Sequence, residues 1–302
     1  MIDSHAHLIS GDTARYPPAP PGGVINDADF EDPMTIERLA GEMDAACVDK
    51  AVLVQRGSIY GFDSSYVCDS AARFPDRFAA VCSIDASQPD AAEQVCHWVR
   101  DRGAVGIRLM ELVKGSGLGW LDASTGRDAC AASRDLGVPV CVHLFPWNRV
   151  DGLARIAALL TDLPGLTVVI DHLGAINCSA APPDYGVDEL LASVARFSGA
   201  HVKFTTIPLG RLEQTGIDAK PIIRRVMDLF GASRMMWGSD ITQSAGTYAY
   251  MTALAHASVA GLSSAEQDSL LGGTAGQLYG RNWSAGLGSP GFPPVSPKVE
   301  PR

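Results

Sequence analysis

The chain has 302 residues, of which 46% are hydrophobic and 19% charged, so a large folded core is expected and global disorder is not. A formal net charge of −10 argues against a nucleic-acid partner, because phosphate binding needs a basic surface. Every apolar run is shorter than the roughly 18 residues of a membrane span, and no signal peptide is recognisable, so we expect a cytoplasmic protein without a membrane partner.

Short apolar runs recur at fairly even spacing along the chain, and each predicts a strand. They cover residues 2–7, 51–55, 79–84, 104–110, 138–144, 166–173, 201–206 and 235–240. Segments with helical periodicity lie between them, over residues 34–47, 90–102, 149–163, 187–197, 217–230 and 247–260. Gly103 and Gly137 each follow a helical run and precede a strand, as helix C-cap glycines do.

Apolar strands that alternate with helices are typical of a parallel sheet covered on both faces. Eight such units predict a (β/α)8 TIM barrel, and no glycine-rich phosphate fingerprint of an open nucleotide-binding sheet follows the first strand. We expect one barrel domain over residues 1–283, with short C-terminal helices at 264–271 and 274–279. The Gly-, Pro- and Ser-rich residues 284–302 predict an extended tail.

The seven cysteines are scattered, form no Cys-x-x-Cys pair and mostly lie in apolar runs such as the one around Cys141. This pattern is typical of reduced, buried cysteines in a cytoplasmic protein. A disulfide framework is therefore not expected.

Side chains that can bind metal ions stand at the predicted C-terminal ends of four strands. His5 and His7 end the first strand, His143 the fifth, His172 the sixth and Asp240 the eighth. Because active sites of this architecture lie at that end, we expect the five side chains to share one pocket. Imidazole and carboxylate ligands suit one zinc ion, with manganese as the alternative.

Each residue of this group has an expected chemical role. Asp240 can take a proton from water as general base and return it to the leaving oxygen. His172 can stabilise negative charge that develops on a substrate oxygen. The simpler interpretation of Asp240, a capping residue after a strand, is disfavoured by the other strand ends. The remaining histidines are interpreted as structural, namely His97, His201 and His256.

Further polar residues near the strand ends are candidates for substrate binding. Gln55 and Arg56 end the second strand, Tyr60 follows it, and Lys203 lies on the seventh. Arg108, on the fourth strand, alternates with apolar neighbours and is predicted to point into the barrel. A substrate carboxylate or an acid of the pocket would be the partner that a buried arginine needs.

Three motifs carry a resemblance to the amidohydrolase superfamily: Asp-Ser-His-Ala-His over residues 3–7, Asp-His-Leu-Gly over 171–174 and Trp-Gly-Ser-Asp over 237–240. Nearly the whole chain most resembles the amidohydrolase 2 branch of lactonases and non-oxidative decarboxylases. The later two motifs look more like those of the sugar-lactone and 2-pyrone-4,6-dicarboxylate lactonases. Decarboxylases of the branch usually carry a glutamate where this chain has Ala175, which favours hydrolysis.

The resemblance implies one divalent metal ion held by His5, His7, His143 and Asp240. Lys203 is not on the fourth strand, which carries the metal-bridging lysine of two-metal relatives. Some lactonases of the branch work without metal, so a metal-free site stays open.

The implied reaction is hydrolysis, in which an activated water opens a lactone or related cyclic ester. The implied substrate is a small molecule that can carry a carboxylate. The first alternative is a metal-dependent decarboxylase of an aromatic or unsaturated carboxylic acid. The second is a barrel that only binds ligands, which the intact set of strand-end residues disfavours. The oligomeric state, with a homodimer among the possibilities, is not fixed by these residues.

Overall fold

Eight parallel strands form the centre of the structure, a computed structural model that describes residues 1–180 and 182–283. They pair side by side in chain order. Their bounds are β1 (Ile2–Ala6), β2 (Lys50–Val54), β3 (Phe78–Ser83), β4 (Gly106–Met110), β5 (Val140–His143), β6 (Val168–Ile170), β7 (Ala200–Thr205) and β8 (Met235–Gly238). Past the end of β8, the Asp240 N–H donates to the His5 carbonyl oxygen at 2.7 Å. The predicted (β/α)8 barrel is confirmed, and the predicted tail lies outside the described residues.

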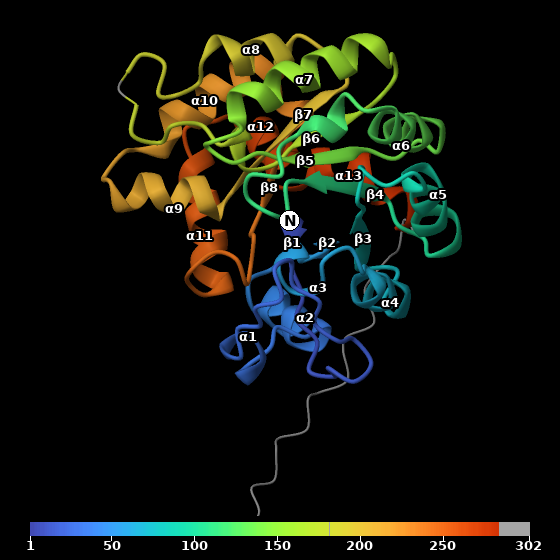
Figure 1. Ribbon diagram of the computed structural model, residues 1–302. Coiled ribbons are helices and arrows are strands. Elements are labelled where there is room, and N and C mark those ends of the chain that lie inside the picture. The colour runs from blue at the N-terminus through green and yellow to red at the C-terminus, as the bar shows by residue number, and fades with distance from the viewer. Residues whose placement is uncertain (181, 284–302) are drawn as a thin grey trace, which may run out of the picture.

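Helices surround the strands, with α7 and α8 on one side of the sheet and α2 and α4 on the opposite side (Figure 1). The α-helices are α1 (Ala28–Glu31), α2 (Ile36–Ala45), α3 (Gly57–Tyr60), α4 (Ser65–Arg73), α5 (Ala91–Cys96), α6 (Ser124–Asp135), α7 (Arg149–Asp162), α8 (Glu189–Ala195), α9 (Thr206–Gln214), α10 (Ala219–Phe230), α11 (Tyr248–Val259), α12 (Ser264–Asp268) and α13 (Thr274–Tyr279). Two π-helical turns occur at His97–Asp101 and Ser269–Gly273. Short 3-10 turns occur at Gly119–Leu121, His172–Gly174, Ala232–Arg234 and Gly280–Asn282.

The six helices predicted between the strands are present, as α2, α5, α7, α8, α10 and α11. Three helices of nine residues or more, α4, α6 and α9, were not predicted. The helix α6 lacks the sequence pattern on which such predictions depend. It buries only small side chains, so it has no stripe of large apolar residues: Gly126, Ala129, Cys130 and Ser133. In α9, Pro208 and Gly210 weaken the helical pattern of the sequence.

The core has two parts, one between strands and helices and one inside the barrel. On β7, Val202 and Phe204 belong to the outer part, so the alternating Lys203 and Thr205 point inward. Apart from Met236, the part of this inner core on and next to the strands consists of small or branched side chains: Val52, Val54, Ala79, Val81, Val105, Cys141 and Val169. Tyr279 of α13 packs into this inner part, so α13 closes one end of the barrel.

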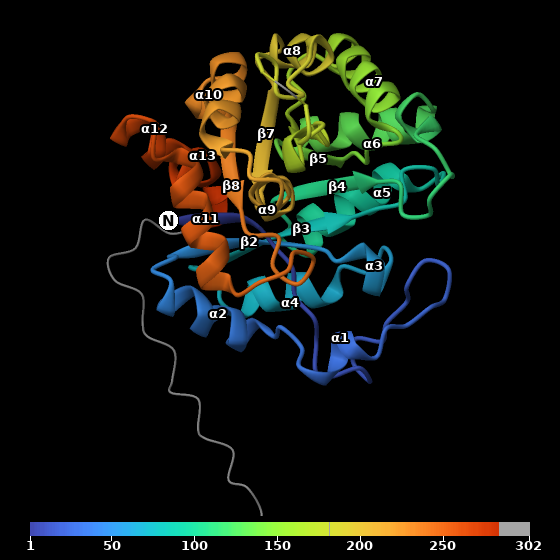
Figure 2. The same cartoon turned by 90° about the vertical axis from the view of Figure 1, so that its left-hand side faces the viewer.

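The last helices pack against the strands that begin and end the barrel. Figure 2 shows α11 and α13 next to β8 and the N-terminus, and α13 contacts both β1 and β8. Within residues 1–180 and 182–283, no helix has the length and apolar character needed to span a membrane.

Candidate active site

A cavity of about 610 Å³ opens at the C-terminal ends of the strands. Six of the predicted site residues line it: His7, Arg56, Arg108, His143, His172 and Asp240. Apolar side chains from the segments after β4 to β7 form much of the remaining wall: Met110, Leu112, Leu144, Phe145, Ile176, Ile207 and Pro208. The cavity therefore combines a polar group of imidazoles, arginines and a carboxylate with an apolar wall.

The close approach of β1 and β8 brings His5 next to Asp240. Gly238 makes this approach possible, because a Cβ atom there would lie 2.4 Å from the Cβ atom of His5. The buried Asp3 carboxylate joins the two strands, since its Oδ1 accepts the backbone N–H groups of His5 at 2.9 Å and Ser239 at 2.8 Å. Burial raises the pKa of Asp3 despite these hydrogen bonds.

Three of the cavity residues, His172, Ala175 and Asp240, have left-handed backbone conformations, which are unfavourable for residues other than glycine. The φ angle is 54° at His172 and 56° at Asp240. Leu173 and Ala175 have φ angles of 54° and 53°, so β6 ends at Ile170, before the end of the predicted strand. Such conformations cost about 1–3 kcal/mol each and are typical of functional sites.

The Asp240 carboxylate is held from one side and faces two imidazoles on the other. The Ser244 hydroxyl donates to Asp240 Oδ2 at 2.9 Å. Asp240 Oδ1 lies 3.3 Å from His7 Nε2 and 3.5 Å from His5 Nε2. His7 Nδ1 contacts the Val54 carbonyl oxygen at 2.7 Å and must donate to it, so Nε2 of a neutral His7 carries a lone pair.

The donor atoms of His5, His7 and Asp240 fit a divalent metal ion. They lie within 4.8 Å of one another, and all three residues are buried. His5 Nε2 and Asp240 Oδ1 have no hydrogen-bond partner among the described residues, which is costly for buried polar atoms. Three nitrogen and oxygen ligands with open positions are typical of catalytic zinc sites. The structure thus brings together three of the four predicted ligands.

His143, the fourth predicted ligand, is not part of this group of neighbouring donor atoms, and Arg108 occupies its Nδ1 atom. Arg108 Nη2 donates to His143 Nδ1 at 2.7 Å, and Arg108 Nε donates to Asp171 Oδ2 at 2.9 Å. A guanidinium group has only donors, so the ring proton of a neutral His143 is on Nε2. Burial lowers the pKa of His143 well below its ordinary value, which favours the neutral ring. His143 is therefore a hydrogen-bond donor at the cavity.

Asp171 and Lys203 are fully buried beneath His5. Asp171 Oδ1 lies 3.4 Å from Lys203 Nζ and 3.4 Å from His5 Nδ1. Burial alone would raise the pKa of Asp171, but the positive charges of Lys203 and Arg108 hold it well below its ordinary value. Lys203, predicted to bind substrate, is absent from the described cavity lining. Asp171 belongs to the Asp-His-Leu-Gly motif, but the sequence does not reveal its partners, because Arg108, His5 and Lys203 are distant along the chain.

His172 is oriented by a residue that was not predicted to belong to the site. Its Nδ1 atom lies 2.6 Å from the Thr205 hydroxyl oxygen. Its Nε2 atom is buried and has no hydrogen-bond partner within the described part of the chain. Burial also lowers the pKa of His172, so the ring is neutral near pH 7. A substrate oxygen in the cavity is a suitable partner for the unpaired nitrogen.

The three substrate-binding candidates after β2 lie in different environments. Arg56 lines the cavity and is 8% exposed, with Nη1 unpartnered in the described residues and Nη2 3.5 Å from Asp29 Oδ1. Gln55 is buried and donates to backbone carbonyl groups of the following loop. The Tyr60 hydroxyl accepts the Ser10 N–H at 2.8 Å. Of these candidates, Arg56 alone lines this cavity.

Glu111, a buried carboxylate that sequence reasoning missed, lies in the chain between two residues that line the cavity, Met110 and Leu112. Glu111 Oε1 accepts the N–H groups of Gly115 at 2.6 Å and Gly117 at 3.0 Å. Glu111 Oε2 accepts from Trp147 Nε1 at 2.9 Å and Asn148 Nδ2 at 2.7 Å. Burial would raise the pKa of Glu111, but these four hydrogen bonds lower it. Glu111 therefore fixes the loop after β4 against the loop after β5.

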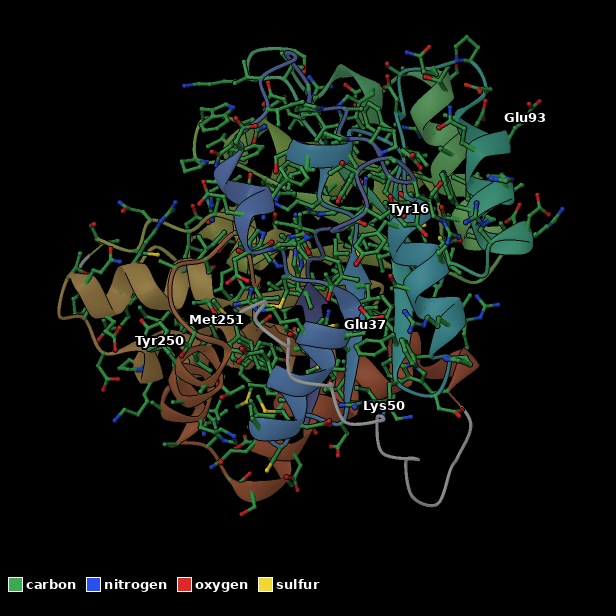
Figure 3. The ribbon with its side chains drawn as sticks, turned by 90° about the horizontal axis from the view of Figure 1, so that it is seen from below. Tyr16, Glu37, Lys50, Glu93, Tyr250 and Met251 are labelled. Carbon is green, nitrogen blue, oxygen red and sulfur yellow. The ribbon has the colours of Figure 1, made fainter. Side chains whose placement is uncertain are left out.

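Tyr250 lines the cavity and was also missed. It lies on α11 close to α9 (Figure 3), and its hydroxyl donates to the Glu213 carboxylate of α9. Tyr250 lines the cavity together with Arg211 and Gln214 of α9. No strand-end signal marks these residues, because their position depends on how two helices pack.

The barrel and its strand-end polar group define a class of enzymes that react at the C-terminal face of the strands. Residues 2–281 match the family model described as Amidohydrolase, and the chain belongs to this family. The chain is similar to L-fucono-1,5-lactonase of Burkholderia ambifaria, with 27% identity over 256 residues that cover 79% of each protein.

Two crystal structures show the same fold. A candidate 2-pyrone-4,6-dicarboxylic acid hydrolase from Pseudomonas putida has a TM-score of 0.74 and 22% identity, covering 92% of this chain and 97% of the other. An amidohydrolase from Burkholderia multivorans with bound zinc has a TM-score of 0.71 and 22% identity, covering 92% and 98%.

Proposed function

We propose that this protein hydrolyses a lactone or related cyclic ester, with Asp240 as the general base. The main observation in support of this proposal is the buried Asp240 carboxylate at the cavity. Its Oδ2 atom accepts a hydrogen bond from Ser244, and its Oδ1 atom has no partner among the described residues. Burial alone would raise the pKa of Asp240, but the histidines around it, His7 first, lower it well below its ordinary value. Asp240 is therefore ionised near neutral pH and able to accept a proton. Similarity to a lactonase supports this reaction.

The reaction requires two proton transfers at Asp240. A water attacks the lactone carbonyl carbon as its proton passes to the Asp240 carboxylate, forming a tetrahedral intermediate. The ring C–O bond then breaks, and Asp240 returns the proton to the leaving ring oxygen. The product is an open-chain hydroxy acid.

Two histidines are placed to stabilise the negative charge on the carbonyl oxygen. Arg108 fixes the proton of neutral His143 on Nε2, which makes this atom a donor. The Thr205 hydroxyl can donate to His172 Nδ1, which puts the His172 proton on the unpaired Nε2 atom. Donors fixed before the reaction need not reorganise as charge develops, which is the largest single contribution in many acyl-transfer enzymes.

We also propose that His5, His7 and Asp240 hold one divalent ion, zinc rather than manganese. The orphaned His5 Nε2 and Asp240 Oδ1 atoms support this assignment, as does the zinc in a protein of similar fold. A bound ion polarises the carbonyl group and lowers the pKa of a coordinated water. The Val54 carbonyl contributes by orienting His7, as hydrogen-bonded carbonyl groups do for metal-binding histidines.

The cavity favours a ring-sized substrate with at least one polar substituent. Arg56 has a buried, unpartnered Nη1 atom at the cavity, which suits a carboxylate or hydroxyl group. Arg108 is already committed to Asp171 and His143, so Arg56 is the proposed substrate anchor. Sugar 1,5-lactones such as L-fucono-1,5-lactone are the first substrates to test.

The test is a proton-release assay with a panel of sugar 1,5-lactones, 2-pyrone-4,6-dicarboxylate and simple aliphatic lactones. At least one lactone should give kcat/KM of about 10⁴ M⁻¹s⁻¹ or more. A His201→Gln variant is the matched control, because His201 opens β7 at the opposite end of the barrel. Carbon dioxide release from hydroxylated aromatic acids, without lactone turnover, would instead support decarboxylation. Ala175 lines the cavity and offers no carboxyl group for that alternative.

A further inference from the structure

Lys203 is a buried cation that the proposed reaction does not use. Its Nζ atom lies 3.4 Å from His5 Nδ1, 3.4 Å from Asp171 Oδ1 and 3.8 Å from Cys141 Sγ, and the side chain is fully buried. A buried charge is tolerated only when it is paired and hydrogen-bonded. An ammonium has three donors and no acceptor, so these three atoms are the available acceptors. Lys203 thus contacts residues of the site from within the barrel and does not itself line the cavity.

His5 Nδ1 faces two groups with opposite demands. Lys203 Nζ and Asp171 Oδ1 each lie 3.4 Å from this nitrogen. A hydrogen bond from Lys203 requires a lone pair on Nδ1, whereas a hydrogen bond to the Asp171 carboxylate requires a proton there. Because a neutral imidazole carries one proton, the partner of Nδ1 decides whether Nε2 has a proton or a lone pair.

The consequence falls on the metal-binding side of the ring. When Lys203 donates to His5 Nδ1, the His5 proton is on Nε2 and can be donated to Asp240 Oδ1, 3.5 Å away. This arrangement pairs two buried atoms that otherwise lack a partner in the described residues, whereas donation from His5 Nδ1 to Asp171 would pair a third such atom, Asp171 Oδ1. When Nδ1 donates to Asp171, Nε2 presents the lone pair that a metal ligand needs, with a carboxylate behind the ring.

We propose that Lys203 is a positioning residue that weakens divalent-metal binding by holding His5 in the tautomer with its proton on Nε2. Asp171 acts in the opposite direction, because it stabilises the metal-binding tautomer. The positive charge of Lys203 adds repulsion toward a cation on the other side of the ring. This inference rests on the proposed metal group of His5, His7 and Asp240. It explains how one site keeps Asp240 oriented both with and without an ion.

The test measures zinc affinity without any substrate, by competition with a chromophoric zinc chelator. Lys203→Met should bind zinc about ten to a hundred times more tightly than wild type, and Asp171→Asn should bind it more weakly by a similar factor. Lys220→Met is the matched control, because Lys220 lies in the first turn of α10 with a 49% exposed side chain, and it should leave zinc affinity unchanged. Weaker or unchanged zinc binding in Lys203→Met would overturn the proposal, provided that far-UV circular dichroism shows it folded.

A second measurement reads the tautomer in the wild-type protein and uses a variant only to assign the signal. NMR of wild-type protein with ¹⁵N-labelled histidine reports the tautomer of His5, assigned by comparison with His5→Asn. In the metal-free protein the proton should be on Nε2, and zinc should move it to Nδ1. A proton on Nδ1 before zinc is added would overturn the proposal. Neither readout involves a lactone, so the absence of lactonase activity and the failure of this inference are distinguishable.

Discussion

Arg108 should contribute to stability and to turnover, because one guanidinium joins Asp171 to His143. We consider Arg108→Met, which keeps much of the side-chain volume and removes every donor. Asp171 Oδ2 and His143 Nδ1 each lose the hydrogen bond from Arg108. The first loss concerns the fold beneath the cavity, and the second concerns the ring that faces the substrate.

The expected magnitude follows from burial and from the charges that stay. Removal of one partner from a buried ion pair costs about 3–5 kcal/mol, and the Arg108 side chain is 4% exposed. Lys203 stays 3.4 Å from the other Asp171 oxygen, so we expect the lower end, about 3 kcal/mol. Without its donor at Nδ1, His143 no longer has a fixed proton on Nε2, and kcat should fall about a hundredfold.

Urea unfolding followed by tryptophan fluorescence measures the stability difference. Charged partners hold the pKa of Asp171 well below its ordinary value. Asp171 therefore stays ionised at neutral pH, and the ion pair is lost only when the pH falls to the lowered pKa. The stability difference should thus be constant between about pH 7 and 8, above the range in which the buried histidines titrate. Arg108→Lys keeps a charge for Asp171 but cannot reach His143 as well, so it should recover stability and not kcat.

A loss of less than about 1 kcal/mol in Arg108→Met would contradict the assigned role of the ion pair. Full kcat in Arg108→Lys would contradict the role of Arg108 in fixing the His143 proton. The two results test separate contacts of Arg108, because the stability loss concerns Asp171 and the loss of kcat concerns His143.

Three further predictions concern other parts of the site. Thr205→Val should lower kcat on the order of tenfold because it removes the hydroxyl that orients His172, whereas Thr205→Ser keeps the hydroxyl and should not. Equal kcat values for the two variants would contradict this role of Thr205. Burial lowers the pKa of His5, His143 and His172, so the unfolded state binds more protons below about pH 6.5. Urea titrations at about pH 7.5 and 5.5 should show lower stability at the acidic pH, and equal stability would contradict the buried neutral rings. Glu111→Ala should raise KM several-fold with little change in kcat, because it releases the loops after β4 and β5, and an unchanged KM would contradict this role.

Most of the fold could be predicted because strand and helix alternation is a local property of the sequence. The barrel follows from eight such units, and the strand-end positions of His5, His143 and Asp240 follow from the barrel. The helix α6 could not be predicted in this way, because its buried face consists of small residues. The cytoplasmic location, the homodimer and the tail stay predictions from the sequence.

The interior of the site depends on depth within the barrel, which a strand pattern does not give. Lys203 and Thr205 both point inward from β7, but Lys203 lies beneath His5 and Thr205 contacts His172. The pairing of Arg108 with Asp171 joins residues 63 positions apart. No periodicity in the sequence predicts such pairs, so the contact between Arg108 and His143 Nδ1 could not be predicted.

The most direct test of Asp240 as the base is the kcat of Asp240→Asn on the lactone that the wild type hydrolyses fastest. Asparagine has the same shape but cannot accept the proton of the attacking water. We predict that kcat falls by about a thousandfold or more, while the hydroxy-acid product still binds. A kcat within about tenfold of wild type would show that another group activates the water.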